Sequence, residues 1–211
     1  MPNMTYSSTE EKIITARISL LLKKPFFGNM ATRLILKEST DIPTAAVDGK
    51  HLWYNKKFID ELNIKQTEFL LGHEVLHVAF EHMLRRGDRD PQGWNVACDY
   101  AVNQILVDEN IGEAPKGGNA PLLDAQYSNL SAEQIYEKLS DMQKQQKTLD
   151  VHIDLENGEA TIKDKDGKEQ TVKIGDGMSK ADQDALRDEI KNSLLQSAKA
   201  SASSGDKAGS I

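Results

Sequence analysis

The chain has 211 residues, of which 38% are hydrophobic and 6% aromatic, so it can form one domain with a core of moderate size. The formal charge of −7 argues against nucleic acid as a partner, because a phosphate backbone is bound by a basic surface. A single cysteine, Cys98, excludes an intramolecular disulfide and an all-cysteine metal site. No apolar run is long enough to span a membrane and no secretory signal is evident, so we expect a cytoplasmic protein.

A helix is expected near the N-terminus, over residues 8–23, where apolar side chains recur at helical spacing. Ser7, Ser8 or Thr9 can cap its first turn. Pro25 and Gly28 follow, and both residue types are typical of the end of a helix. The sequence therefore predicts one helix before the chain turns.

Three short strands are expected next, forming a small antiparallel sheet. The first lies within residues 32–39. The other two lie within residues 44–55, on either side of the dipeptide Asp48-Gly49, which supplies the positive φ angles of a two-residue hairpin turn. Residues 56–62 then predict a brief helix.

Two longer helices are expected in the middle of the chain. Residues 64–84 predict one continuous helix in which most side chains are apolar. After a turn-rich break, residues 95–107 predict a second helix that packs antiparallel to the first. A further helix begins after Ser131, which precedes Gln134 at capping-box spacing.

The pattern changes after residue 148. Apolar and polar residues alternate with period two, and the dipeptides Asn157-Gly158 and Asp166-Gly167 are hairpin signals, so we expect a three-stranded β-meander. One face of its first strand carries Leu149, Val151, Ile153 and Leu155. The residues from 198 onward are small and polar, as in a frayed helix end or a linker.

Residues 73–77 read His-Glu-x-x-His within the helix expected over residues 64–84. His73 and His77 are four residues apart, so they share a helix face and their ring nitrogens can bind one ion at about 2.0–2.1 Å. Glu74 is rotated by about 100° from His73, which places its carboxylate beside the metal. Because such groups are costly in an apolar helix, the pattern favours a zinc hydrolase over isolated polar residues.

A catalytic zinc site commonly has three protein ligands, and Asp99 is the favoured third one. It is the acid in the middle of the otherwise apolar helix expected over residues 95–107, where a carboxylate needs a cation. Asn103, one turn further on, can orient this ligand. The alternative for Asp99 is a solvent-facing carboxylate or a salt bridge with Arg85 or Arg86.

His82 is a poorer choice for the third ligand. It lies nine residues after His73, so a continuous helix turns it about 180° away. No Gly or Pro lies between the two histidines to break the helix. We therefore expect His82 to lie at the helix end or to support a ligand from behind. Glu81 and Asp90 are weaker alternatives.

The stretch GHEVLHVAFEHMLRRGDRDPQGWNVACDYAVNQIL closely resembles the predicted metallopeptidases of bacteria and phages in which a zincin-like domain precedes a von Willebrand factor A-like domain. The segments LLLKKPFFGNMATRLIL, VDGKHLWYNKKFI and LLDAQYSNLSAEQIYEKL resemble the same family in the same order. The resemblance covers about residues 12–140 and rests on several motifs. Cys98 departs from the small residue that the family pattern has at that position.

The resemblance implies a zincin-like fold, a zinc ion and peptide-bond hydrolysis. With the elements above, we expect an α+β fold in which a small antiparallel sheet packs on helices, the HExxH motif lies on a central helix, and a β-meander follows. His73, Glu74 and His77 enter the site by this resemblance, which also favours Asp99 as the third ligand. A bacterial or phage-infected cell is the implied location.

Three parts of the chain are expected on this basis. Residues 1–145 form a zincin-like metallopeptidase domain, and residues 146–178 form a β-meander appendage. Residues 179–211 form a helix and a flexible tail, which is expected to lead to a von Willebrand factor A-like domain outside this chain.

The expected function is that of a zinc-dependent metallopeptidase that hydrolyses peptide bonds through a metal-activated water, with Glu74 as the general base. Tyr100, His82 and Arg85 are alternative donors to the oxyanion. A peptide or protein substrate is expected to lie extended along the sheet edge, with residues 51–55 as the edge strand. The alternatives are a non-catalytic, metal-containing binding or assembly module and a metal hydrolase of another substrate class. Nucleic acid and membranes are not expected partners.

Overall fold

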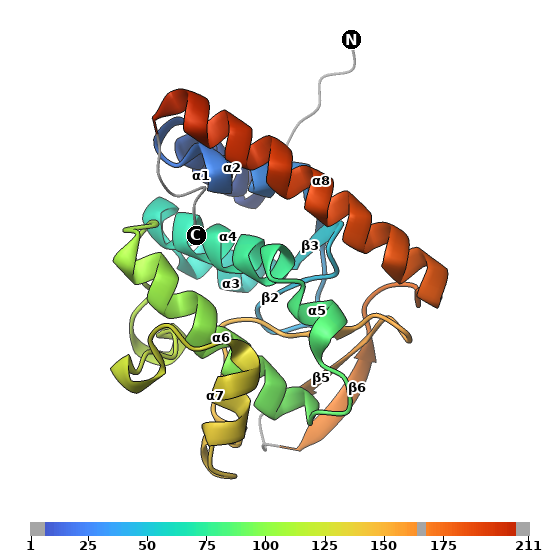
Figure 1. Ribbon diagram of the computed structural model, residues 1–211. Helices are drawn as coiled ribbons and strands as arrows, with labels where there is room; N and C mark the ends of the chain where they lie inside the picture. Colours follow the sequence, from blue (N-terminus) through green and yellow to red (C-terminus); the bar gives the residue numbers. More distant parts are fainter. Residues whose placement is uncertain (1–6, 164–167, 206–211) are drawn as a thin grey trace.

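The computed structural model describes residues 7–163 and 168–205. Within these ranges the fold is α+β, as expected, with helices forming most of the body and two three-stranded sheets (Figure 1). No helix in the described part is long and apolar enough to cross a membrane. The helices are α1 (Ser8–Lys23), α2 (Pro25–Arg33), α3 (Lys56–Glu61), α4 (Ile64–Ala79), α5 (His82–Arg85), α6 (Pro91–Asp108), α7 (Ala132–Lys138) and α8 (Lys180–Ser204). The strands are β1 (Ile35–Glu38), β2 (Ala45–Val47), β3 (His51–Tyr54), β4 (Ile153–Asp154), β5 (Glu159–Lys163) and β6 (Glu169–Lys173).

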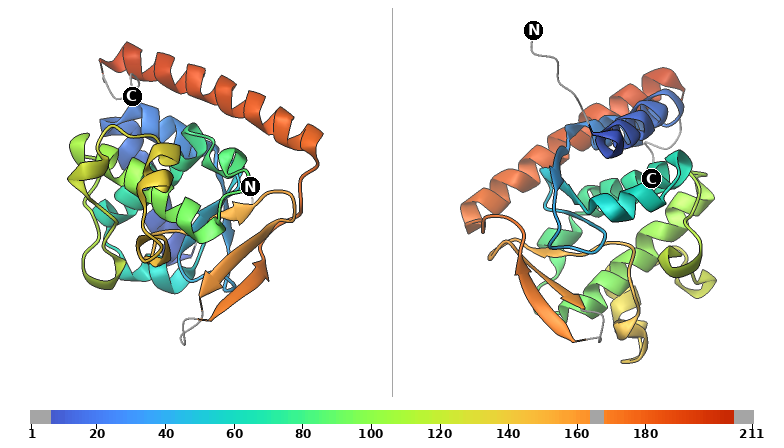
Figure 2. Two further views of the ribbon diagram at one scale, coloured as in Figure 1. Left: turned by 60° about the horizontal axis from the view of Figure 1, so that its bottom comes forward. Right: turned by 180° about the vertical axis from the view of Figure 1, so that it is seen from behind.

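Helix α4 lies in the middle of the fold (Figures 1 and 2). Asn63 caps its first turn and forms a capping box with Gln66, in which each side chain accepts a hydrogen bond from the backbone N–H of the other residue. Every residue from Thr67 to Val78 is buried. A helix buried on all sides needs neighbours on all sides, and α4 contacts α1, α2, α6, α8 and β2. The HExxH motif therefore lies on a helix that the described part of the chain encloses on all sides.

The first sheet has the strand order β1-β3-β2 and is mixed, so the prediction of an antiparallel sheet is wrong for β1. β2 and β3 form the expected hairpin, in which the Asp48 carboxylate accepts hydrogen bonds from the backbone after the turn and Gly49 has a φ of 94°. β1 pairs with β3 in parallel. The hairpin signal determines the relative direction of β2 and β3 only, and nothing local determines that of β1. Residues 51–54 are consequently the central strand, and not the expected edge; β2 is an edge of this sheet.

Helices α1 and α2 pack closely at a glycine. Ser7 caps α1 and forms a capping box with Glu10, in agreement with the predicted cap. Pro25 follows the end of α1 but also begins α2, where its missing N–H has no helical partner to lose. Gly28 therefore lies inside a helix that the sequence did not predict. A Cβ atom at this position would lie 2.3 Å from the backbone nitrogen of Leu21 in α1.

Gly28→Ala is expected to lower the free energy of unfolding by about 1–3 kcal/mol, because the backbones of α1 and α2 have to move apart. Gly118→Ala is the control, since a Cβ there meets open space and its φ lies outside the left-handed region. The control is expected to change stability by no more than about 0.5 kcal/mol. Urea unfolding followed by circular dichroism measures both variants, and equal stability of Gly28→Ala and wild type contradicts the close approach of the two helices.

The helix expected over residues 64–84 breaks at Glu81 and resumes as α5, so the prediction of one continuous helix is wrong. Glu81 has a φ of 55°, which is uncommon for a residue other than glycine. Two guanidinium groups hold this conformation. Arg187 of α8 pairs with the Glu81 carboxylate at 2.9 Å, and Arg85 donates to the carbonyl of Phe80 at 2.7 Å. Contacts with other parts of the fold thus stabilise the break in the helix. No Gly or Pro residue near Glu81 signals it.

The predicted C-terminal meander is confirmed as the antiparallel sheet β4-β5-β6. Residues 157–158 lie in its first turn, where Gly158 has a φ of 66°; the second hairpin signal, residues 166–167, lies outside the described residues. The chain just before β4 does not belong to the meander. There the backbone N–H of Val151 donates to the carbonyl of Ala45, so this segment lies against β2.

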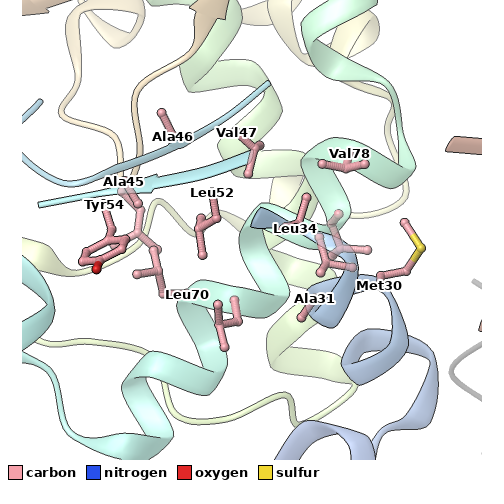
Figure 3. Close-up of a cluster of buried hydrophobic side chains, with 14 of the residues drawn as sticks. Met30, Ala31, Leu34, Ala45, Ala46, Val47, Leu52, Tyr54, Leu70 and Val78 are labelled. Atoms are coloured by element: carbon pink, nitrogen blue, oxygen red, sulfur yellow. The ribbon is translucent and has the colours of Figure 1, made fainter. Parts of the chain in front are cut away.

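One large hydrophobic core joins the N-terminal and C-terminal parts of the chain. Helix α8 packs on α2 and α4 (Figures 1 and 2). Leu149, Val151 and Leu186 belong to the same core as Leu70 and Val78 of α4. Figure 3 shows the region where α2, the first sheet and α4 meet; its labelled side chains are Met30, Ala31, Leu34, Ala45, Ala46, Val47, Leu52, Tyr54, Leu70 and Val78.

Candidate metal centre

Helices α4 and α6 bring three of the predicted ligands to one point. His73 and His77 lie one turn apart on α4, and their Nε2 atoms are 3.0 Å apart. The Oδ1 atom of Asp99, on α6, is 3.7 Å from the Nε2 atom of each histidine. All three side chains are buried. The structure therefore places His73, His77 and Asp99 close enough to share one cation.

A fourth donor comes from a part of the chain that the sequence did not single out. Asp150 is buried, and its Oδ1 atom lies 3.6 Å from the Nε2 atom of His73. One donor atom from each of His73, His77, Asp99 and Asp150 lies within 4.8 Å of the other three. Ligands at about 2.0–2.1 Å from a tetrahedral ion are about 3.3–3.4 Å apart, so this cluster has nearly the spacing that such an ion needs.

The charges around this point also fit a cation. Oδ1 of Asp99 and both carboxylate oxygens of Asp150 are buried and have no hydrogen-bond partner among the described residues. Burial alone would lower the pKa of His73, but the carboxylates of Asp99 and Asp150 outweigh it and raise this pKa to about 10. In a site without metal, a proton on His73 thus supplies the positive charge that the carboxylates require. A metal ion in that place satisfies the same need.

Asn103 fixes the orientation of His73. The Nδ2 group of Asn103 donates to the carbonyl of Leu122 at 3.1 Å, so its Oδ1 atom faces the histidine and can only accept. Nδ1 of His73 lies 2.8 Å from this oxygen and therefore carries the proton. In the neutral ring this leaves the lone pair of Nε2 directed at the other donors. Asn103 had been expected to orient Asp99; it contacts the histidine instead.

Glu74 lies next to the four donors but does not belong to them. Its side chain is fully buried, and neither carboxylate oxygen has a hydrogen-bond partner in the described part of the chain. Burial, followed by the negative charge of Asp150, raises the pKa of Glu74 well above its ordinary value. A carboxylate in this environment has a high affinity for a proton.

Two further histidines contact Nδ1 of His77, and one of them, His152, also has its Nε2 atom 3.7 Å from Oδ2 of Asp150. Nδ1 of His82 and Nε2 of His152 lie 3.0 and 3.1 Å from Nδ1 of His77. Because the helix breaks at Glu81, the 180° rotation expected for His82 does not apply. His82 nevertheless contributes no atom to the cluster of four donors. Burial and neighbouring histidines lower the pKa of His77 and His82, so both rings tend to be neutral.

The other two side chains considered as oxyanion donors are engaged elsewhere. The Tyr100 hydroxyl donates to Oε1 of Gln146 at 2.8 Å. The Arg85 guanidinium forms an ion pair with Glu133 at 2.7 Å. Both groups thus have partners other than the four donors.

Sequence reasoning missed Asp150 and His152, although a signal for both was present. The alternation that buries Leu149 and Val151 places Asp150, His152 and Asp154 on the other face of the same segment. Acidic and imidazole groups at every second position have two interpretations: they can be metal ligands, or they can be the solvent-facing side of a strand. Without knowledge that this segment lies against α4 and α6, the second interpretation is the simpler one.

Comparisons with known proteins agree with a metal site. The family model described as "Putative metallopeptidase domain" matches residues 8–211. A curated uncharacterized protein of Thermotoga maritima is 25% identical over 104 residues, which cover 46% of this chain and 26% of that protein. The matched region thus spans about a quarter of the relative's length. No solved structure matches the chain. Because the family model covers nearly the whole sequence, the chain belongs to this metallopeptidase-domain family.

Proposed function

We propose that the chain is a zinc-dependent metallopeptidase. The observation that carries this proposal is the convergence of His73, His77 and Asp99 on one point, with the unpartnered carboxylate of Glu74 at the adjacent position of α4. Imidazole and carboxylate donors at tetrahedral spacing are a set that zinc accepts. Membership of a family described as metallopeptidases supports a peptide bond as the target.

Each residue of the site would have a separate role in hydrolysis. His73, His77 and Asp99 would hold the ion, which when bound supplies activation of water and polarisation of the peptide carbonyl. Glu74 would take a proton from the attacking water and deliver it to the leaving amine nitrogen. Asn103 keeps His73 in the tautomer whose Nε2 is free.

A zincin-like arrangement of the substrate is part of the proposal. In this arrangement a peptide lies extended beside the edge of the small sheet, where backbone hydrogen bonds hold it. The edge next to α4 is β2, since β2 contacts α4 and β3 lies between β1 and β2. β2 therefore replaces residues 51–55 as the expected docking edge.

A non-catalytic metal-containing module is the second candidate, and one observation favours it. Asp150 supplies a fourth protein donor, and four protein ligands are typical of a structural zinc site. In a structural zinc site, however, Glu74 has no role, because no bound water has to be deprotonated. A buried carboxylate without a hydrogen-bond partner is costly, so its presence supports the catalytic alternative.

The test is a measurement of bound metal together with hydrolysis. The purified chain is expected to bind about one zinc ion and to cleave an unfolded protein such as casein. A chelator is expected to remove both the metal and the cleavage, and added zinc to restore them. A chain that binds no zinc at stoichiometric level when the ion is supplied contradicts the proposal.

A further inference from the structure

The segment of residues 148–154, called the strap below, covers the metal centre. The backbone N–H of Leu149 donates to Oδ2 of Asp99 at 3.0 Å, so the strap is bonded to a donor residue. The side chain of Asn95, on α6, donates to Oγ1 of Thr148 at 3.0 Å and to the carbonyl of Asp150 at 3.1 Å. These contacts aim the carboxylate of Asp150 at the other three donors.

The strap also occupies the edge of the first sheet next to the metal centre. β2 has β3 on one side, and on its other side the N–H of Val151 donates to the carbonyl of Ala45 at 2.9 Å. An extended peptide substrate would use this same edge. The backbone of the strap therefore lies where a substrate peptide would pair with β2. The carboxylate of Asp150 lies at the fourth donor position, which the reacting water needs.

A cavity of about 380 Å³ lies on the outer side of the strap. His152 and Asp154 of the strap line this cavity, together with Arg86 and Trp94. His82 also lines it, but none of the four donor residues does. The cavity thus ends at the two histidines that contact His77, and the strap separates it from the donors.

The outer end of the strap is β4, which pairs with β5 and buries Ile153, and a polar contact at the surface adds to these interactions. Oδ2 of Asp154 accepts a hydrogen bond from the Arg86 guanidinium at 2.8 Å, and both side chains are partly exposed. The inner end is fixed by the burial of Leu149 and Val151. Arg86, β4 and β5 all lie outside the two helices that carry His73, His77 and Asp99.

We propose that the strap is a built-in inhibitory cover: Asp150 and the backbone beside β2 hold the places of the reacting water and the substrate, and the strap has to move aside before a peptide is bound. This inference rests on the proposed metallopeptidase function. The inference explains why a fourth protein donor and an unpartnered Glu74 occur together. Asp150 is the fourth donor while the strap covers the site, and Glu74 acts once the strap has moved aside.

The test uses the full chain loaded with cobalt(II), whose visible absorption reports its ligands, and azide as a small probe of an open position. Asp150→Ala is expected to bind azide at least about tenfold more tightly than wild type, because a position held by a protein group becomes available. Casein hydrolysis, measured separately on the zinc-loaded proteins, is expected to be faster in the variant.

A second variant tests the strap without touching a metal donor. Arg86→Ala removes the contact with Asp154, and we expect deuterium uptake of the strap amides and azide affinity to rise about two- to fivefold, as the loss of one partly exposed ion pair predicts. Lys24→Ala is the matched control, since it breaks a similarly exposed ion pair with Glu109 that does not contact the strap. The control is expected to behave as wild type.

The outcomes separate this inference from the proposed function. Equal azide affinity in wild type, Asp150→Ala and Arg86→Ala overturns the cover. Loss of cobalt or tighter azide binding in Asp150→Ala, with Arg86→Ala unchanged from wild type, makes Asp150 a permanent ligand and also overturns it. Azide binding that increases as expected, without cleavage of any peptide by the zinc-loaded variants, supports the cover and contradicts peptide hydrolysis. A chain that binds no metal contradicts the proposed function itself.

Discussion

Replacing His73 with alanine is expected to weaken zinc binding strongly. The variant loses one of the four donors. Structural zinc sites have an apparent binding free energy of about 10–16 kcal/mol, so the loss of one donor should lower the zinc affinity by about 100-fold or more. The stabilisation that zinc gives the folded chain should fall with it. At a free zinc concentration 1,000 times the wild-type dissociation constant, that stabilisation is about 4 kcal/mol. Chelator competition measures the affinity, and thermal unfolding with and without zinc measures the stabilisation.

His51→Ala is the control for this experiment. His51 is a partly buried histidine that bonds to Asp48 at 2.7 Å in the β2–β3 hairpin, and it contributes no atom to the donor cluster. This variant should retain the zinc-dependent rise in unfolding temperature. If His73→Ala binds zinc as tightly as wild type, the ion is held elsewhere and the candidate metal centre is wrong.

Glu74→Gln is expected to keep the fold and the metal but to lower the rate of peptide hydrolysis by about 10²–10⁴-fold. The amide has nearly the shape of the carboxylate, so the packing of α4 should change little. It cannot accept the proton of the attacking water, however, and the transfer to the leaving nitrogen fails as well. The measurement is the rate of casein cleavage at equal zinc content, in the wild-type chain and in the Asp150→Ala background.

Glu68→Gln is the matched control for the loss of a carboxylate. Glu68 is also buried on α4, but its carboxylate pairs with Lys23 at 3.6 Å and lies more than one turn from the HExxH motif. Hydrolysis should proceed as in wild type. Equal rates for Glu74→Gln and wild type would show that Glu74 is not the general base.

The parts of the fold with local signals could be predicted from the sequence. The capping boxes of Ser7 with Glu10 and of Ser131 with Gln134 depend on residues three positions apart, and both are present. The α+β class and the C-terminal meander follow from hydrophobic periodicity and turn dipeptides in the same way. The histidine pair of the HExxH motif is local too, since a single helical turn brings it together.

The features that could not be predicted depend on contacts between distant segments. Glu81 adopts its left-handed conformation beside Arg187, more than 100 residues further on, and no residue near Glu81 signals the break. β1 could pair with β3 in either direction, and the sequence pattern does not distinguish the parallel arrangement from the antiparallel one. Asp150 joins the site only because its segment lies against α4 and α6.

The donors of the metal centre are made in a fixed order during synthesis of the chain. His73, His77 and Asp99 lie within one pair of helices, whereas Asp150 follows Asp99 by about fifty residues. At about 5–20 residues per second, a ribosome needs about 3–10 s to make the intervening segment. The nascent chain therefore passes through a stage in which three donors exist without the fourth. In terms of the proposed cover, the strap is the last part of the site to be made, so a metal ion would reach the other three donors before the strap does.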